Sequence, residues 1–140
     1  MREIKFRAFL RSDQRLPNGI TLGYEKYPRG IYEVMDINFA SEIVTLWSEK
    51  EQTSFEVSFR KVELLQYTGH KDKNGKEIYD GYIVKGNFIK DNSEVIGKVA
   101  YFDKDTAFIC HLLDGDYAIL VSLEHLEVIG NIYENPELLQ

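Results

Sequence analysis

The chain has 140 residues, of which 44% are hydrophobic and 29% are charged, and its formal net charge is −6 at pH 7. This composition excludes a disordered chain. No apolar run approaches the roughly 18 residues of a membrane helix, and the N-terminus lacks the apolar core of a secretory signal. We therefore expect a globular protein of the cytoplasm, with no membrane partner.

Alternation of apolar and polar side chains predicts strands in the first half of the chain. Residues 4–10 alternate in this way, and residues 54–60 place Phe55, Val57 and Phe59 on one face. Short runs of β-forming residues predict further strands at residues 20–22, 31–39 and 43–47. Together these strands predict a small antiparallel meander.

The centre of the chain, residues 65–85, has the clearest turn chemistry. Asp72-Lys73-Asn74-Gly75 predicts a tight hairpin turn or a bulged variant, because Asn and Gly tolerate positive φ. Gly69 and Gly81 are expected where the backbone bends or packs closely. A strand is expected to begin at Tyr82.

A calcium-binding loop is the functional alternative for this turn. Asp72 and Asn74 begin like such a loop, but Lys76 stands where an oxygen ligand is needed and Glu77 where a glycine is needed. We therefore favour the connecting hairpin.

The second half of the chain also alternates between short strands and turns. Strands are expected at residues 83–89, 95–102, 107–113, 117–121 and 126–133. Residues 122–125 are expected to form one helical turn. Residues 135–139 are expected to form a short helix with Asn135 as its N-cap and Pro136 at its first position. Strands of this length and spacing predict a small β-barrel or sandwich.

Charge divides the chain into two parts. Residues 1–64 contain 10 basic and 10 acidic side chains, whereas residues 65–140 contain 7 Lys, no Arg and 13 acidic side chains. We therefore predict two subdomains, residues 1–64 and residues 65–140.

Three blocks of sequence, in order, resemble the YopX family of small bacteriophage and prophage proteins. They are Ile4-Lys5-Phe6-Arg7-Ala8, the stretch from Gln66 to Gly81, and the stretch from Val128 to Leu139. The resemblance implies a mainly β fold whose C-terminal part is an SH3-like β-barrel. With the strand pattern of the first half, we expect a small antiparallel N-terminal sheet packed on this barrel. It implies no activity.

Within these blocks we expect structural roles for the motif residues, namely Gly69, Asp72, Asn74, Gly75, Tyr79, Gly81, Gly130, Asn131 and Pro136. The chain departs from the family pattern at two places. Phe9-Leu10 replaces a common Trp-Asp pair, and Tyr82 replaces a common acidic residue.

Residues with catalytic or metal-binding chemistry are scattered. His70, His111 and His125 have no closely spaced second ligand, which argues against a zinc site. Cys110 lies among apolar residues, so we interpret it as a core residue and not as a reactive thiol assisted by His111. We expect no catalytic residue, metal or cofactor, and no enzymatic activity.

Two hypotheses of function remain. The first is a protein-interaction or self-assembly module, whose partners are a second copy and an unidentified phage or host protein. The second is a nucleic-acid surface on the first strand, in which basic residues are interleaved with an aromatic residue: Lys5, Arg7, Phe9, Arg11 and Arg15.

Charge argues against the second hypothesis, because the acidic second half would repel phosphate. An ordinary solvated strand face, with Phe9 in a minor core, explains the same residues. A third idea, an acidic mimic of nucleic acid, has no ordered row of carboxylates to support it.

Overall fold

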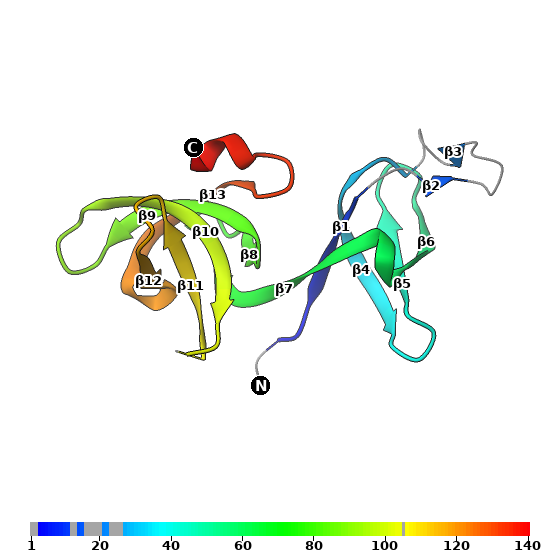
Figure 1. The fold of residues 1–140 in the computed structure, drawn as a ribbon, viewed down its shortest axis with the longest axis horizontal. Coiled ribbons are helices and arrows are strands. Elements are labelled where there is room, and N and C mark those ends of the chain that lie inside the picture. Colours follow the sequence, from blue (N-terminus) through cyan, green and yellow to red (C-terminus); the bar gives the residue numbers. More distant parts are fainter. Residues whose placement is uncertain (1–2, 12–13, 16–20, 23–26, 105) are drawn as a thin grey trace. The chain divides into compact units, whose positions relative to one another are not determined.

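The computed structural model describes residues 3–11, 14–15, 21–22, 27–104 and 106–140 (Figure 1). This part of the chain is mainly β, its strand pairs are antiparallel, and its helical elements are single 3-10 turns. The predicted fold class is confirmed at this level. None of the sheets in the described residues is closed into a barrel.

The chain divides into two compact units. The N-terminal unit is Lys5–Leu65, and the C-terminal unit comprises Met1–Ile4 and Gln66–Gln140. No helix in the described ranges is both long enough and apolar enough to cross a membrane.

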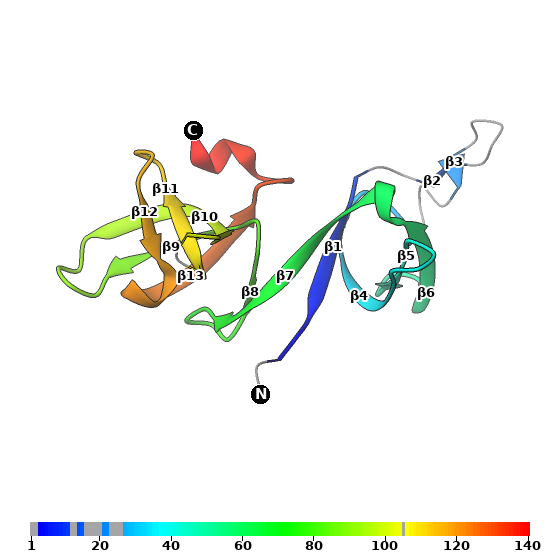
Figure 2. The ribbon, with the colours of Figure 1, turned by 60° about the horizontal axis from the view of Figure 1, so that its bottom comes forward.

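The N-terminal unit is built on a sheet with the strand order β6-β5-β4-β1 (Figures 1 and 2). Its elements are β1 (Phe6–Leu10), β2 (Gln14–Arg15), β3 (Thr21–Leu22), β4 (Gly30–Asn38), β5 (Ile43–Ser48), β6 (Thr53–Ser58) and the 3-10 turn η1 (Phe59–Lys61). Strands β2 and β3 pair as a separate ribbon. The predicted meander is confirmed, although Ile20 lies outside the described residues.

Alternating side chains of this sheet form its core. In the register of β5 with β6, Val44 lies opposite Val57 and Leu46 opposite Phe55. Ala8 and Leu10 of β1 complete the centre of the cluster, and both are fully buried. The period-two pattern therefore predicted the burial of Ala8, Leu10 and Val57, whereas Ile4 is 70% exposed and Phe9, which the pattern placed with the polar residues, is 4% exposed.

The C-terminal unit contains a five-stranded sheet with the order β12-β11-β10-β9-β13 (Figures 1 and 2). Its elements are β8 (Glu77–Tyr79), β9 (Tyr82–Phe88), β10 (Glu94–Phe102), β11 (Ala107–Leu112), β12 (Tyr117–Ile119), η2 (Leu120–Ser122), β13 (Leu123–Asn131) and η3 (Pro136–Leu139). Strand β7 (Val62–Lys71) begins in the N-terminal unit and ends in this one, where it pairs with β8.

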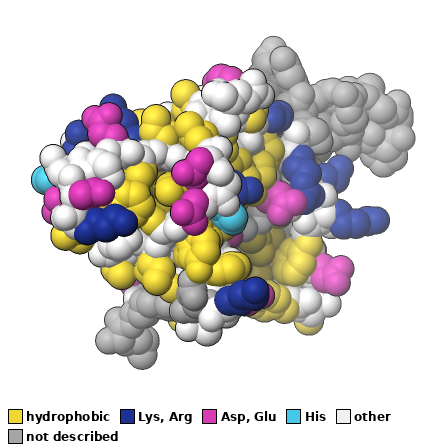
Figure 3. All heavy atoms as spheres, turned by 60° about the vertical axis from the view of Figure 1, so that its left-hand side comes forward, with side chains coloured by type: hydrophobic (Ala, Val, Ile, Leu, Met, Phe, Trp, Pro, Cys, Tyr) yellow, Lys and Arg dark blue, Asp and Glu magenta, His cyan; other side chains and the backbone are white. Residues whose placement is uncertain are grey.

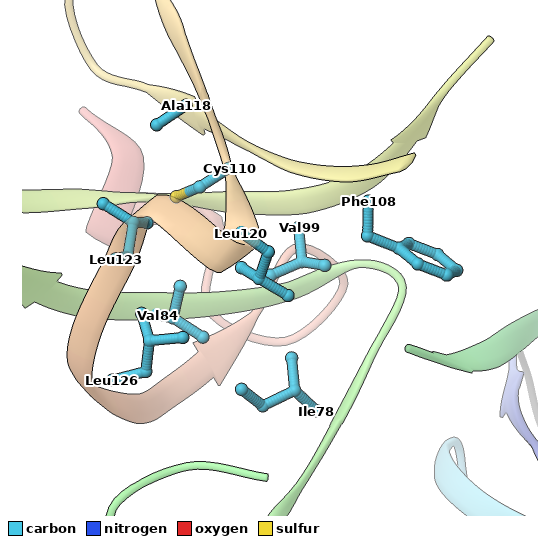
Figure 4. Close-up of a cluster of buried hydrophobic side chains, with 9 residues drawn as sticks. All are labelled: Ile78, Val84, Val99, Phe108, Cys110, Ala118, Leu120, Leu123 and Leu126. Carbon is cyan, nitrogen blue, oxygen red and sulfur yellow. The ribbon is translucent and has the colours of Figure 1, made fainter. Parts of the chain in front are cut away.

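The core of the C-terminal unit is drawn in Figure 4. Its buried members come from several strands and from η2: Ile78, Val84, Val99, Phe108, Cys110, Ala118, Leu120, Leu123 and Leu126. Cys110 is fully buried, as predicted, and its burial raises the pKa of the thiol to about 12. A thiolate is therefore disfavoured at neutral pH, which makes this cysteine a packing residue.

One local prediction was wrong, and a second was confirmed in position but not in its capping bond. The 3-10 turn lies at Leu120–Ser122, whereas residues 123–125 belong to β13, where His125 has a φ of 56° beside a register shift. Asn135 precedes η3, but its side chain makes no capping bond to that turn. It accepts a hydrogen bond from the backbone N–H of Asn131 instead, so a tertiary contact replaces the expected cap.

Candidate functional site

The motif residue Asp72 is the centre of a hydrogen-bond network in the C-terminal unit. Its Oδ1 accepts from the backbone N–H groups of Asn74 and Lys76, both at 2.9 Å. Its backbone carbonyl accepts from Gly75 at 3.0 Å, and its own N–H donates to the carbonyl of Lys76 at 2.7 Å. These bonds close the turn between β7 and β8.

The same turn is bonded to strand β13. Oδ2 of Asp72 accepts from the N–H of Val128 at 3.0 Å, and the N–H of Lys73 donates to the carbonyl of Leu126 at 2.7 Å. Strand β13 is an edge of the five-stranded sheet. The turn therefore caps backbone groups that this edge would otherwise present to solvent.

Hydrogen bonding also fixes the charge state of Asp72. Burial of the carboxyl group acts to raise its pKa, but the backbone donors of Val128, Lys76 and Asn74 together lower it below the ordinary value of 3.8. Both carboxylate oxygens are already accepting bonds, which favours the hairpin over a calcium loop. Gly75 has a φ of 82°, as the turn chemistry predicts.

The C-terminal motif is held by a second compact network. Oδ1 of Asn131 accepts from the N–H groups of Tyr133 and Glu134, and its Nδ2 donates to the Glu134 carboxylate at 2.9 Å. A Cβ atom added at Gly130 would lie 2.7 Å from Oδ1 of Asn135. Only glycine fits against this turn without a rearrangement, and the motif ends where Pro136 begins η3.

Gly81 and Tyr79 join the strands between these two networks. The N–H of Gly81 donates to Val99 at 2.8 Å, and its carbonyl accepts from Ile132 at 2.9 Å. The ring of Tyr79 lies 5.5 Å from that of Tyr67 and 5.6 Å from that of Tyr82. The replacement of an acidic residue by Tyr82 therefore adds a buried ring to an aromatic row.

The motif blocks are thus occupied by folding contacts in this unit. Asp72, Asn131 and the motif glycines are positioned to close turns and to fix strand edges, and Gly69 takes a φ of 87° in β7. These contacts give the motif residues the structural roles that the sequence predicted.

The basic strand proposed for nucleic acid is engaged within the N-terminal unit. Arg7 forms an ion pair with Glu33 at 3.2 Å, and Arg11 forms one with Glu63 and donates to the carbonyl of Arg60. These partners lie in β4, η1 and β7. They are far from the first strand in the sequence, so the strand pattern could not predict the contacts.

The aromatic member of that surface is not exposed. Phe9 is 4% exposed, and the guanidinium of Arg29 lies 4.8 Å from the centre of its ring. Base stacking needs an open ring face. Lys5 is half-buried, and the side chain of Arg15 lies outside the described residues. The geometry therefore disfavours the proposed nucleic-acid surface.

Two of the three histidines lie around one open hollow. His70 and His125 line a hollow of about 510 Å³ together with Lys71, Lys73 and Glu124. His111 is exposed on β11. No group of three or more His, Cys, Asp or Glu side chains within the described ranges is arranged to hold a metal ion.

An exposed apolar surface follows strand β12, and we call it the β12 margin. It consists of Leu113, Tyr117, Ile119 and Val121, which are 55%, 40%, 39% and 66% exposed. Figure 3 shows hydrophobic side chains at the surface of the protein, interrupted by acidic groups. Sequence analysis missed this surface because the same residues read as an ordinary strand.

A smaller hollow adjoins the β12 margin at Leu113. It has a volume of about 360 Å³ and is lined by Val95, Ile96, Leu112 and Leu113, with the carboxylates of Glu94 and Asp114 beside them. An apolar floor with acidic groups beside it can accept an apolar side chain next to a basic one.

Comparison with known proteins supports the fold. The model of the family described as YopX protein matches residues 5–140. The crystal structure of protein EF1440 from Enterococcus faecalis is 27% identical, covers 100% of both chains and has a TM-score of 0.58. The crystal structure of YopX from Bacillus subtilis is 22% identical over 100% of both chains, with a TM-score of 0.57. None of the curated proteins matches this chain.

Proposed function

The chain belongs to the YopX family, and from this premise we propose that it is a non-catalytic module that acts by binding proteins, including a second copy of itself. The family itself supplies no activity. The proposal therefore rests on surfaces of this chain.

The observation that carries the proposal is the β12 margin. Four apolar side chains between residues 113 and 121 are each more than a third exposed. Single exposed apolar residues are common, whereas several within one short segment suggest an interaction site. The hollow beside Leu113 extends this surface with a recess for a partner side chain.

Charge defines the kind of partner that suits the β12 margin. The C-terminal unit has a net charge of −6, and Asp114 and Asp116 flank the margin. Two such units would repel one another at low salt. We therefore assign the margin to a different protein, one that presents apolar side chains next to lysine or arginine.

Two finer features belong to the same proposal. The C-terminal strand order, with a 3-10 turn directly before the last strand, supports an SH3-like arrangement. The family resemblance leads us to expect a phage or prophage protein that works in the host cytoplasm.

The test is affinity capture with the full chain as bait, in an extract of phage-infected bacteria. We expect the wild type to retain a protein that the double variant Ile119→Ser with Val121→Ser loses. A matched control is Met35→Ser with Ile89→Ser, since both positions are also more than half exposed but lie outside the β12 margin. Failure of the wild type to retain any protein, or equal retention by the two double variants, would contradict the proposed role of this margin.

A further inference from the structure

Strand β6 is the regular outer strand of the N-terminal sheet. It pairs with β5 from Ser48 opposite Thr53 to Ile43 opposite Ser58, without a register shift. Its sequence, TSFEVS, contains no proline and no lysine. Proline, lysine and β-bulges are features that ordinarily block an exposed sheet edge. Strand β6 has none of the three.

A backbone hydrogen bond just after the end of β6 shows which of its residues face β5 and which face outward. The N–H of Phe59 donates to the carbonyl of Glu42 at 3.0 Å, which continues the β5–β6 ladder. Bonded pairs alternate along an antiparallel ladder, so Thr53, Phe55 and Val57 face β5. The backbone groups of Ser54, Glu56 and Ser58 therefore point away from the sheet.

The two edges of the five-stranded C-terminal sheet are treated differently. Asp72 and Lys73 cap β13. At β12, the N–H of Tyr117 donates to the Asp116 carboxylate at 2.8 Å, and the carbonyl of Ile119 accepts from Ser122 at 2.6 Å. Strand β6 has six residues, whereas β12 has three. Within the described residues, the outward groups of Ser54 and Glu56 meet one side chain, the hydroxyl of Thr53, which donates a long hydrogen bond of 3.5 Å to the carbonyl of Ser54.

A second copy is the occupant that this edge fits, because β6 is complementary to itself in one antiparallel register. The N-terminal unit, residues 5–65, contains 9 basic and 9 acidic side chains and is therefore neutral, whereas the C-terminal unit carries −6. Repulsion between two copies is therefore weaker at the N-terminal unit than at the C-terminal unit. We propose that β6 pairs antiparallel with β6 of a second copy, joining two N-terminal sheets across a two-fold axis.

One register fits this pairing best. If Phe55 lies opposite Phe55 of the second copy, each Ser54 lies opposite a Glu56, and the outward groups of both residues form the bonded pairs. The ring of Phe55 already packs on Tyr27 at 4.0 Å and on Tyr32 at 5.2 Å within its own chain, so backbone bonds and the absence of facing carboxylates favour this register. A shift that places Glu56 opposite Glu56 would instead bring two like charges together.

The inference rests on the self-assembly part of the proposed function, and charge substitutions at Ser54 test it. Ser54 is exposed, so its substitution leaves the core intact. We expect Ser54→Lys to tighten the dimer roughly fivefold by facing Glu56, and Ser54→Glu to weaken it roughly fivefold. Sedimentation equilibrium of the full chain measures both dissociation constants.

Ser41→Lys and Ser41→Glu are the matched controls, because Ser41 is exposed in the turn between β4 and β5. A further variant, Glu56→Pro, removes one outward N–H and is expected to abolish the dimer, whereas Glu56→Gln is expected to retain it. Equal changes in the dissociation constant for the Ser54 and Ser41 variants would overturn the β6 interface but would not contradict self-assembly. A single-chain mass at all concentrations would overturn both, without affecting the capture result at the β12 margin.

Discussion

At the scale of single residues, Asp72 explains why a short motif can define this family's central turn. One carboxylate satisfies three backbone donors, two in its own turn and one on β13, 56 residues away. The side chain is only 8% exposed. Sequence chemistry predicted the turn, but it could not predict the bond to Val128, because alternation patterns contain no information about distant partners.

Asp72→Ala is expected to lower the free energy of unfolding by about 2–4 kcal/mol, because several buried N–H groups lose their acceptor. Chemical denaturation of the full chain measures this loss. Asp91→Ala is the control, since Asp91 accepts comparable bonds from Ser93 in an exposed turn. Equal losses for the two variants would show that burial and the bond to β13 add nothing.

The stabilisation by Asp72 is expected to depend on pH. Its folded-state pKa lies below its ordinary value, because the N–H donors of Val128, Lys76 and Asn74 outweigh the burial that opposes ionisation. A lowered pKa means that the stabilisation is complete above the unfolded pKa of about 3.9 and is lost as the pH falls through the folded value. The difference in stability between wild type and Asp72→Ala should therefore be constant at neutral pH and shrink below about pH 4. A difference that grew on acidification would contradict this assignment.

Two glycines should respond differently to substitution by alanine. Gly75 has a φ of 82° with no atom within 4 Å of an added Cβ, so Gly75→Ala is expected to cost about 1 kcal/mol from backbone strain alone. At Gly97 the added Cβ would lie 2.1 Å from the carbonyl oxygen of His111. Gly97→Ala is therefore expected to cost about 3 kcal/mol, because backbone must move. Thermal melts of both variants compare the two stability losses. A larger loss for Gly75→Ala than for Gly97→Ala would contradict this expectation.

At the scale of elements, the strands could be predicted and some of their ends could not. Alternation in β1 and β6 identified the faces that carry Leu10 and Val57 into the core. The pattern of apolar and polar residues was misleading at residues 122–125, where it is consistent with either a helical turn or a bulged strand. Asn135 occupies the predicted N-cap position of η3, but its side chain bonds to Asn131 and not to the turn.

The candidate surfaces were harder to predict than the strands. The ion pairs of Arg7 with Glu33 and of Arg11 with Glu63 join separate strands, so the first strand looked like a free basic face. The exposure of Ile119 and Val121 depends on which edge of the sheet β12 occupies. Strand order is a property of the folded chain, and local sequence does not specify it.

The C-terminal unit has the elements of an independent fold, namely its own core and two capped sheet edges. We expect a fragment of residues 66–140 to give a β-rich circular dichroism spectrum and a cooperative melt, since its core residues all come from this range. A featureless spectrum without a melting transition would show that the unit needs residues of the N-terminal unit to fold.

At the scale of the whole molecule, charge separates the roles of the two units. The neutral unit carries the outer strand β6, and the acidic unit carries the β12 margin. We propose that the first binds a second copy and the second binds a basic protein.

The same charge distribution predicts no tight nonspecific binding to duplex DNA. Duplex affinity depends mainly on the neutralisation of phosphates, whereas this chain carries −6 and pairs Arg7 and Arg11 with carboxylates. A fluorescence titration at about 150 mM salt tests this expectation. Submicromolar, steeply salt-dependent binding that is lost in Lys5→Glu with Arg7→Glu would contradict it.

If this protein works by association, its mass in solution depends on its concentration. Light scattering coupled to size exclusion should be measured from about 5 to 200 μM, the range in which weak assemblies form. The account predicts a mass that rises from one chain, 16.3 kDa, toward two chains. Because β6 pairs through backbone groups while each chain carries −6, the rise should be at least as large at high salt as at low salt. A mass of 16.3 kDa at every concentration would contradict the account.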